Sequence, residues 1–72
     1  MNTATKEKKV QKRIKAKRSQ MNMSQEELAR RSGLDRKTVN RIERGHYSPS
    51  LESLFMLCSA LKIKPSDILD GI

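Results

Sequence analysis

Apolar positions along the chain have the spacing of helices. Val10, Ile14 and Met21 fall roughly on one helical face, which predicts a first helix from about Lys6 or Val10 to Met21. Residues 1–9 are polar and basic and lack an apolar anchor, so we expect a tail that frays. One domain is expected over residues 10–72. No segment alternates apolar and polar positions as a half-buried strand does.

A second helix is predicted by its start and stop signals. Ser24 is followed three residues later by Glu27, which is the pattern of a capping box, and Met23 and Leu28 have the spacing of a hydrophobic staple. Gly33 can adopt the left-handed conformation that ends a helix. The sequence therefore predicts a short helix between Ser24 and Gly33.

The third predicted helix follows after a tight turn. Asp35 can cap a helix from Arg36 to Arg44, and Gly45 is its expected terminator. Ala29, a small residue, stands where the second and third helices must approach closely. Residues 24–45 thus have the form of a helix-turn-helix unit, whose second helix enters the major groove of DNA.

Two further helices complete an all-α, single compact domain of about five short helices. Ser50 is the expected cap of a fourth helix that runs to about Leu61, and Pro65 suits the first turn of a fifth that ends near Asp70 or Gly71. The fourth helix is expected to turn five apolar side chains inward, namely Leu51, Leu54, Phe55, Cys58 and Leu61.

The third helix separates its side chains by chemistry. At about 100° per residue, an arc of about 140° holds four cations and one amide: Arg36, Lys37, Asn40, Arg41 and Arg44. Val39 and Ile42 lie on the opposite side, with Glu43 at its edge. Arginine and lysine can donate to guanine, and asparagine can bond adenine bidentately. The same cations can also hold phosphates without reading sequence.

Charge is segregated along the chain in the same sense. The 72 residues carry a net charge of +8, but residues 1–48 alone carry +9 and residues 49–72 carry −1. This imbalance favours a polyanionic partner for the first part and another role for the second. The few aromatic residues, Tyr47 and Phe55, argue against a single-stranded RNA-binding surface.

Several other classes of function are disfavoured by composition. Cys58 is the single cysteine and His46 the single histidine, so neither an internal disulfide nor a zinc site made by the protein is expected. We expect Cys58 to be a buried small hydrophobe rather than a redox sensor. No apolar run is long enough to span a membrane, and no nucleophile–base pair or phosphate loop is visible. A non-enzymatic, cytoplasmic protein without cofactor, metal or small-molecule ligand is the expectation.

From about Arg13 to Gly71 the chain resembles the Cro/phage-repressor (Xre-type) helix-turn-helix family. The resemblance rests most strongly on residues 24–45. It is carried by Gln25, Glu27, Leu28, Ala29, Gly33, Val39, Ile42, Glu43, Gly45, Pro49, Ser50, Leu51, Leu54 and Leu61. It implies five helices, with the third as the recognition helix. It also implies base-reading roles for Arg36, Lys37, Asn40 and Arg41, although the two cations at positions 36 and 37 depart from the uncharged residues that the family often uses there.

The resemblance implies further roles outside the recognition helix. Gln25, at the start of the second helix, is expected on a backbone phosphate, and Arg18 and Glu43 are expected to form a largely buried structural ion pair. The loop of Arg44, His46 and Tyr47 is expected near phosphate. Tyr47 either donates its hydroxyl to a phosphate or packs over the loop.

A homodimer on a palindromic operator in double-stranded DNA is expected, because one recognition helix reads only a few base pairs. The resemblance implies interface positions at Pro65 and Ile68, and Ile72 could extend the same apolar patch. The alternative is that Ile63 and Leu69 close the core while the other residues are scattered on the surface. The predicted function is a small transcriptional regulator; an antitoxin that regulates its own synthesis through the same surface is the main alternative.

Overall fold

Five helices make up the computed structural model, which describes residues 3–70 and, for residues 3–8, the backbone alone. They are α1 (Thr3–Gln20), α2 (Gln25–Ser32), α3 (Arg36–Glu43), α4 (Leu51–Ala60) and α5 (Pro65–Leu69), and no strand occurs in this range. The predicted all-α architecture is confirmed. Helix α1 begins at Thr3, earlier than predicted, so helical backbone extends into the expected tail; the domain boundary at residue 10 stays a prediction.

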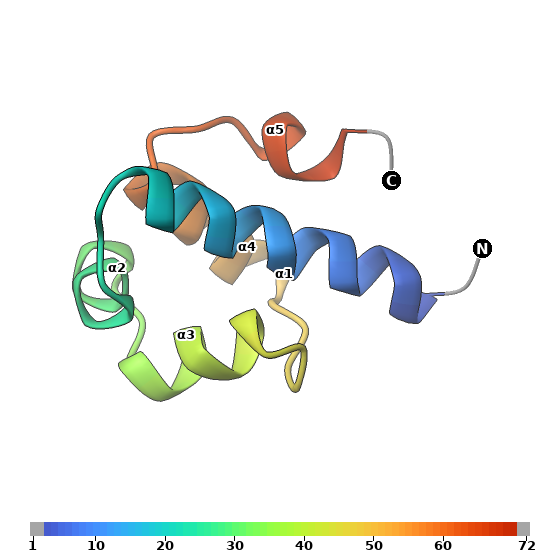
Figure 1. Ribbon diagram of the computed structural model, residues 1–72, viewed down its shortest axis with the longest axis horizontal. Coiled ribbons are helices and arrows are strands. Elements are labelled where there is room, and N and C mark those ends of the chain that lie inside the picture. Colours follow the sequence, from blue (N-terminus) through green and yellow to red (C-terminus); the bar gives the residue numbers. More distant parts are fainter. Residues whose placement is uncertain (1–2, 71–72) are drawn as a thin grey trace.

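The long helix α1 is the axis on which the others are arranged (Figure 1). Helix α3 packs along one side of α1 and the short α5 along another, while α2 packs against both α3 and α4. In the view of Figure 1, α3 and α5 lie at opposite edges of the domain. The helix-turn-helix pair and the C-terminal helix therefore occupy different surfaces.

The core draws at least one buried apolar side chain from every helix. Its largest fully buried members are Ile14, Leu28, Val39, Ile42, Leu57, Leu61 and Ile68. Burying an aliphatic side chain of this size contributes about 1.5–3 kcal/mol relative to leaving it exposed. The inward side of α3 was thus predicted correctly, since Val39 and Ile42 are both buried.

The predicted inner side of α4 is wrong for two of its five residues. Leu51 is 65% exposed and Phe55 is 50% exposed, whereas Leu57, which we did not predict, is buried. Leu54, Cys58 and Leu61 are buried as expected. The reason is that apolar residues surround α4 almost completely, so that periodicity alone does not identify which side faces the core.

Three helix starts are capped as predicted. Ser24 Oγ accepts from the Glu27 N–H at 3.0 Å, Asp35 Oδ1 accepts from the Thr38 N–H at 2.7 Å, and Ser50 Oγ accepts from the Ser53 N–H at 3.1 Å. The capping box is only half formed, because the carboxylate of Glu27 accepts from Arg30 and Arg31 instead.

Helix α2 ends at Gly33, whose φ of 78° lies in the left-handed region that side chains disfavour. A Cβ atom there would also stand 3.2 Å from Cε of Met56. A small residue with positive φ is therefore required at the turn between α2 and α3.

The burial of Ile68 and Leu69 is the reverse of what the sequence suggested, with Ile68 at a dimer interface and, in the alternative, Leu69 in the core. Ile68 is 2% exposed and belongs to the core of the single chain, while Leu69 is 41% exposed. The backbone carbonyl of Ile68 is held as well, accepting from Arg13 Nη1 at 2.8 Å. This burial within one chain argues against the predicted contact of Ile68 with a second copy. Pro65 is half-buried, and Ile72 lies outside the described residues.

Candidate nucleic-acid interface

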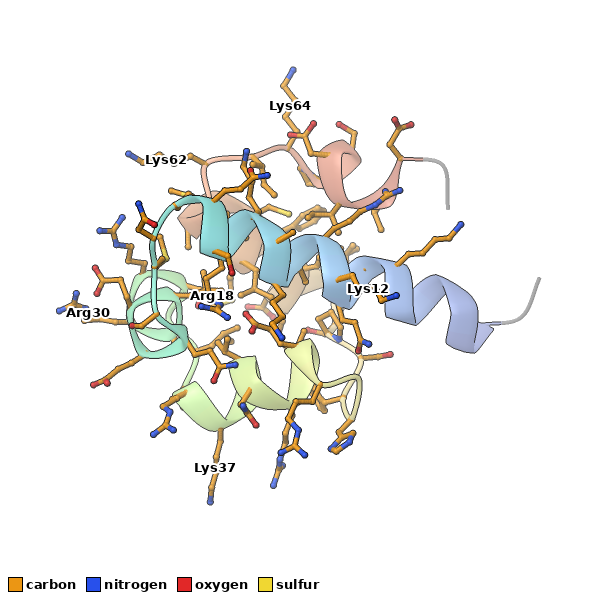
Figure 2. The ribbon with its side chains drawn as sticks, in the orientation of Figure 1. Lys12, Arg18, Arg30, Lys37, Lys62 and Lys64 are labelled. Carbon is orange, nitrogen blue, oxygen red and sulfur yellow. The ribbon has the colours of Figure 1, made fainter. Side chains whose placement is uncertain are left out.

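The outer face of α3 is strongly cationic. Arg36, Lys37 and Arg41 are exposed, as is Arg44, which caps the end of the helix. Lys37 extends away from the body of the domain at the edge that α3 forms (Figure 2). Asn40, the remaining residue of the predicted arc, is only partly exposed. The structure therefore brings the five side chains together on one side of α3, four of them free to meet solvent or a ligand.

An ion pair fixes α3 against α1. Arg18 Nε donates to Glu43 Oε2 at 2.6 Å and Arg18 Nη2 donates to Glu43 Oε1 at 2.9 Å. Arg18 Nη1 also donates to the carbonyl of Met23 at 2.7 Å. The Glu43 side chain is only 1% exposed and that of Arg18 14%. The bidentate geometry resists rotation of α3 about its axis, so it orients the cationic face. Figure 2 shows Arg18 directed from α1 toward the interior.

Gln25 and Asn40 extend this pair toward the surface. Gln25 Nε2 donates to Glu43 Oε1 at 3.0 Å, and Asn40 Nδ2 donates to Gln25 Oε1 at 3.1 Å. The predicted phosphate ligand thus bonds to two protein side chains, and one hydrogen of its amide remains for another acceptor. No sequence pattern indicated this contact, because residues 25 and 40 belong to different helices.

The loop after α3 returns the chain toward α1. His46 donates its N–H to the carbonyl of Arg41 at 2.9 Å, and Gly45 has a φ of 78°. A Cβ atom at Gly45 would collide with the side-chain amide of Gln11 on α1. His46 and Tyr47 are exposed beside this turn, and their contact with phosphate stays a prediction. The closeness of Gln11 to this turn was not foreseen.

The surroundings of Asp35, the N-cap of α3, favour the ionised form of its carboxyl group. The backbone N–H and the side chain of Thr38 donate to Asp35 and lower the pKa of Asp35 below its usual value; the charges of Lys37 and Arg41 lower it further. Asp35 therefore stays ionised as the helix cap.

Two lysines lie away from this cationic face. Lys62 and Lys64, which follow α4, extend from the side of the domain opposite to Lys37 (Figure 2).

Within the part of the chain whose side chains are described, the remaining reactive groups do not form a second site. Cys58 is buried in the core, and burial raises the pKa of its thiol, with a further contribution from the charge of Asp67. Among residues 9–70, whose side chains the structure describes, no three His, Cys, Asp or Glu side chains gather as metal ligands. Within the same range, no helix is both long and apolar enough to cross a membrane.

Several known proteins are similar to this chain in sequence. An uncharacterized HTH-type transcriptional regulator from Archaeoglobus fulgidus is 43% identical over 56 residues, which cover 78% of this chain and 79% of that protein. The control protein C.BamHI of Bacillus amyloliquefaciens is 42% identical over 52 residues, covering 72% of this chain and 64% of that protein.

A solved structure and a family model agree with these relatives. The restriction-modification controller protein C.AhdI from Aeromonas hydrophila superposes with a TM-score of 0.83 at 39% identity, covering 86% of this chain and 94% of that one. The family model described as "Helix-turn-helix" matches residues 14–68, which include part of α1 and nearly all of α2–α5. This chain belongs to the helix-turn-helix family of transcriptional regulators.

Proposed function

We propose that this protein regulates transcription by binding specific double-stranded DNA as a homodimer, with α3 in the major groove. The observation that carries the proposal is the face of α3 on which Arg36, Lys37 and Arg41 are exposed beside Asn40, while Glu43 is turned inward to Arg18. A major groove admits an α-helix and presents a distinct set of donors and acceptors at each base pair. No catalytic step is needed for this function.

The cations of α3 can serve two different purposes. Those that reach base edges select the sequence, whereas those that reach phosphates add affinity without selection. The loop residues Arg44, His46 and Tyr47 and the N-terminus of α2 at Gln25 are the proposed phosphate contacts. A base reader replaced by alanine should cost about 1–3 kcal/mol at the preferred site, and replacing a phosphate ligand should weaken all sequences alike.

The test is selection of bound duplexes from a random pool by the parent protein, followed by affinity measurements on Arg36→Ala, Lys37→Ala and Arg41→Ala. At least one variant should lose preference at a defined base position. If all three retain the parent's ratio of specific to non-specific affinity, and Asn40→Ala does too, α3 is not the recognition helix.

We propose a dimer surface on α4, in place of the one that the sequence predicted on α5. Leu51 and Phe55 stand one helical turn apart and are both exposed, so they form an apolar strip on one side of α4. A second copy of the chain that packs on this strip removes both side chains from water. Two recognition helices then read half-sites about 34–36 Å apart, one turn of DNA.

Phe55→Asp is the variant that examines this surface. It should give a folded monomer in sedimentation experiments at micromolar concentration and lose cooperative binding to a palindromic site. Leu69→Asp, the same change at another exposed apolar position, is the matched control and should leave the dimer intact. Monomers from Leu69→Asp and dimers from Phe55→Asp would place the interface on α5 instead.

A control function for restriction–modification genes is a second candidate. Two of the relatives described above are named control or controller proteins, one of them of a restriction-modification system. Footprinting of the parent protein on the DNA around its own gene, and around any neighbouring nuclease and methyltransferase genes, distinguishes this candidate from a regulator of other genes. The antitoxin alternative has no comparable support among these relatives.

A further inference from the structure

Asn40 differs from the other predicted base readers because its amide is already held by the protein. Its Nδ2 donates to Oε1 of Gln25 at 3.1 Å, and Gln25 Nε2 donates to Oε1 of Glu43 at 3.0 Å. Arg18 donates twice to the same carboxylate. Four side chains from α1, α2 and α3 thus form one continuous chain of hydrogen bonds that ends at the outer side of α3.

The buried Arg18–Glu43 pair determines which atom donates and which accepts in every one of these hydrogen bonds. A guanidinium only donates and a carboxylate only accepts, so Gln25 must turn its NH₂ group toward Glu43. The carbonyl of Gln25 then faces Asn40, which must turn its own NH₂ group inward. Oδ1 of Asn40 is left without a partner within the chain, together with one hydrogen of Nδ2. The charge of Glu43 therefore determines which edge of the Asn40 amide is presented.

We propose that Gln25 is a positioning residue that fixes the Asn40 amide in the orientation that matches adenine. Adenine presents a donor at N6 and an acceptor at N7 in the major groove. Oδ1 of Asn40 accepts from N6 and the free Nδ2 hydrogen donates to N7, while the other Nδ2 hydrogen stays on Gln25. This inference rests on the proposed function, in which α3 reads bases, and gives Gln25 a part in specificity beyond a phosphate contact.

The experiment compares base preference position by position in the parent, Gln25→Ala, Asn40→Ala and the double variant, each by selection from random duplexes and titration of the selected site. Asn40→Ala should lose its preference for one adenine by about 5- to 150-fold. Gln25→Ala should relax the same position. The double variant should lose no more discrimination there than Asn40→Ala alone.

A modified base adds a readout that a purely structural role would not change. Replacing the selected adenine by 7-deazaadenine removes the N7 acceptor, so it should weaken the parent and leave Gln25→Ala and Asn40→Ala unaffected. Gln25→Met, which keeps the side chain's length and removes both hydrogen bonds, should behave as Gln25→Ala does. Gln20→Ala, at an exposed glutamine near the end of α1, is the matched control and should retain the parent's preferences.

Two results would overturn the proposal. One leaves the proposed function intact, and the other contradicts that function as well. If Gln25→Ala and Gln25→Met weaken all duplexes equally and keep the adenine preference, Gln25 is a phosphate contact alone and the proposed function survives. If the parent itself selects no sequence, the proposed function fails and this inference fails with it. Thermal unfolding of each variant verifies that the compared proteins are folded.

Discussion

Helices α3 and α4 differ in how clearly their sequences mark an inner and an outer side. In α3, cations and one amide occupy one arc, and Val39 and Ile42 occupy the other. In α4, apolar residues stand on nearly every side, and two of the largest, Leu51 and Phe55, remain exposed. The orientation of α3 is specified by its own residues, whereas the orientation of α4 is decided by its neighbours.

The two helices therefore present two kinds of surface. The face of α3 carries charge that water solvates well, so its exposure costs little and a polyanion can use it. The strip of Leu51 and Phe55 keeps apolar area in water, at about 25 cal/mol for each Å². An exposed apolar strip of this kind is typical of a surface that another protein covers.

Substitutions at Ile68 and Leu69, neighbours at the end of α5, should give the largest difference in the free energy of unfolding. Ile68→Asp places an unpaired charge in the core, and the loss should approach the whole free energy of unfolding, about 5–15 kcal/mol for a small domain. Leu69→Asp should change this free energy by no more than about 0.5 kcal/mol because Leu69 is exposed. Chemical denaturation of both variants checks the difference. A folded Ile68→Asp monomer would restore Ile68 as an interface residue.

The ion pair behind α3 should show the next largest effect. Arg18→Ala leaves the buried carboxylate of Glu43 without its charged partner and should cost about 3–5 kcal/mol of unfolding free energy. Arg30→Ala removes a cation that is 74% exposed and paired with Glu27, and should cost less than about 1 kcal/mol. Urea titrations measure both values. Equal losses in the two variants would show that burial of the Arg18–Glu43 pair does not increase its contribution to the free energy of unfolding.

Replacing single lysines should have a smaller effect than breaking the ion pair, and it should appear in the salt dependence of DNA binding. Lys37→Ala should reduce the slope of log affinity against log salt by about 1 if Lys37 binds a phosphate, and should leave the slope unchanged if Lys37 reads a base. Lys62→Ala and Lys64→Ala should change neither slope nor affinity, because these lysines extend from the side opposite Lys37 (Figure 2). Fluorescence anisotropy across a salt series is the measurement. A reduced slope in the Lys62 or Lys64 variant would enlarge the interface beyond the α3 side.

The smallest effect concerns the cap of α3. Because Asp35 has a lowered pKa when folded, its ionised form stabilises the protein above the unfolded pKa of about 3.9. This stabilisation is lost as the pH falls through the lowered value. The difference in melting temperature between the parent and Asp35→Asn should be constant above about pH 5 and shrink below about pH 4. A difference that grows on acidification would contradict this role of the carboxylate.

The sequence predicted the helix order, the three capped starts and both sides of α3, because these depend on local signals and on period. It did not predict which of Ile68 and Leu69 is buried, since α5 has only five residues and too few turns to define a face. The link from Asn40 through Gln25 to Glu43 was equally invisible, because it depends on the angle at which α2 crosses α3.

The contact between α1 and α5 has a consequence for how the chain folds. Arg13 donates to the carbonyls of Ile68 and Asp70, so it joins residues 55 and 57 positions apart. Closing so long a loop costs conformational entropy that local helix formation does not recover. A nascent chain that has emerged only as far as α3 lacks this closure as well as the core residues of α4. We therefore expect the domain to acquire its native packing only after α5 has been synthesised, in one cooperative step.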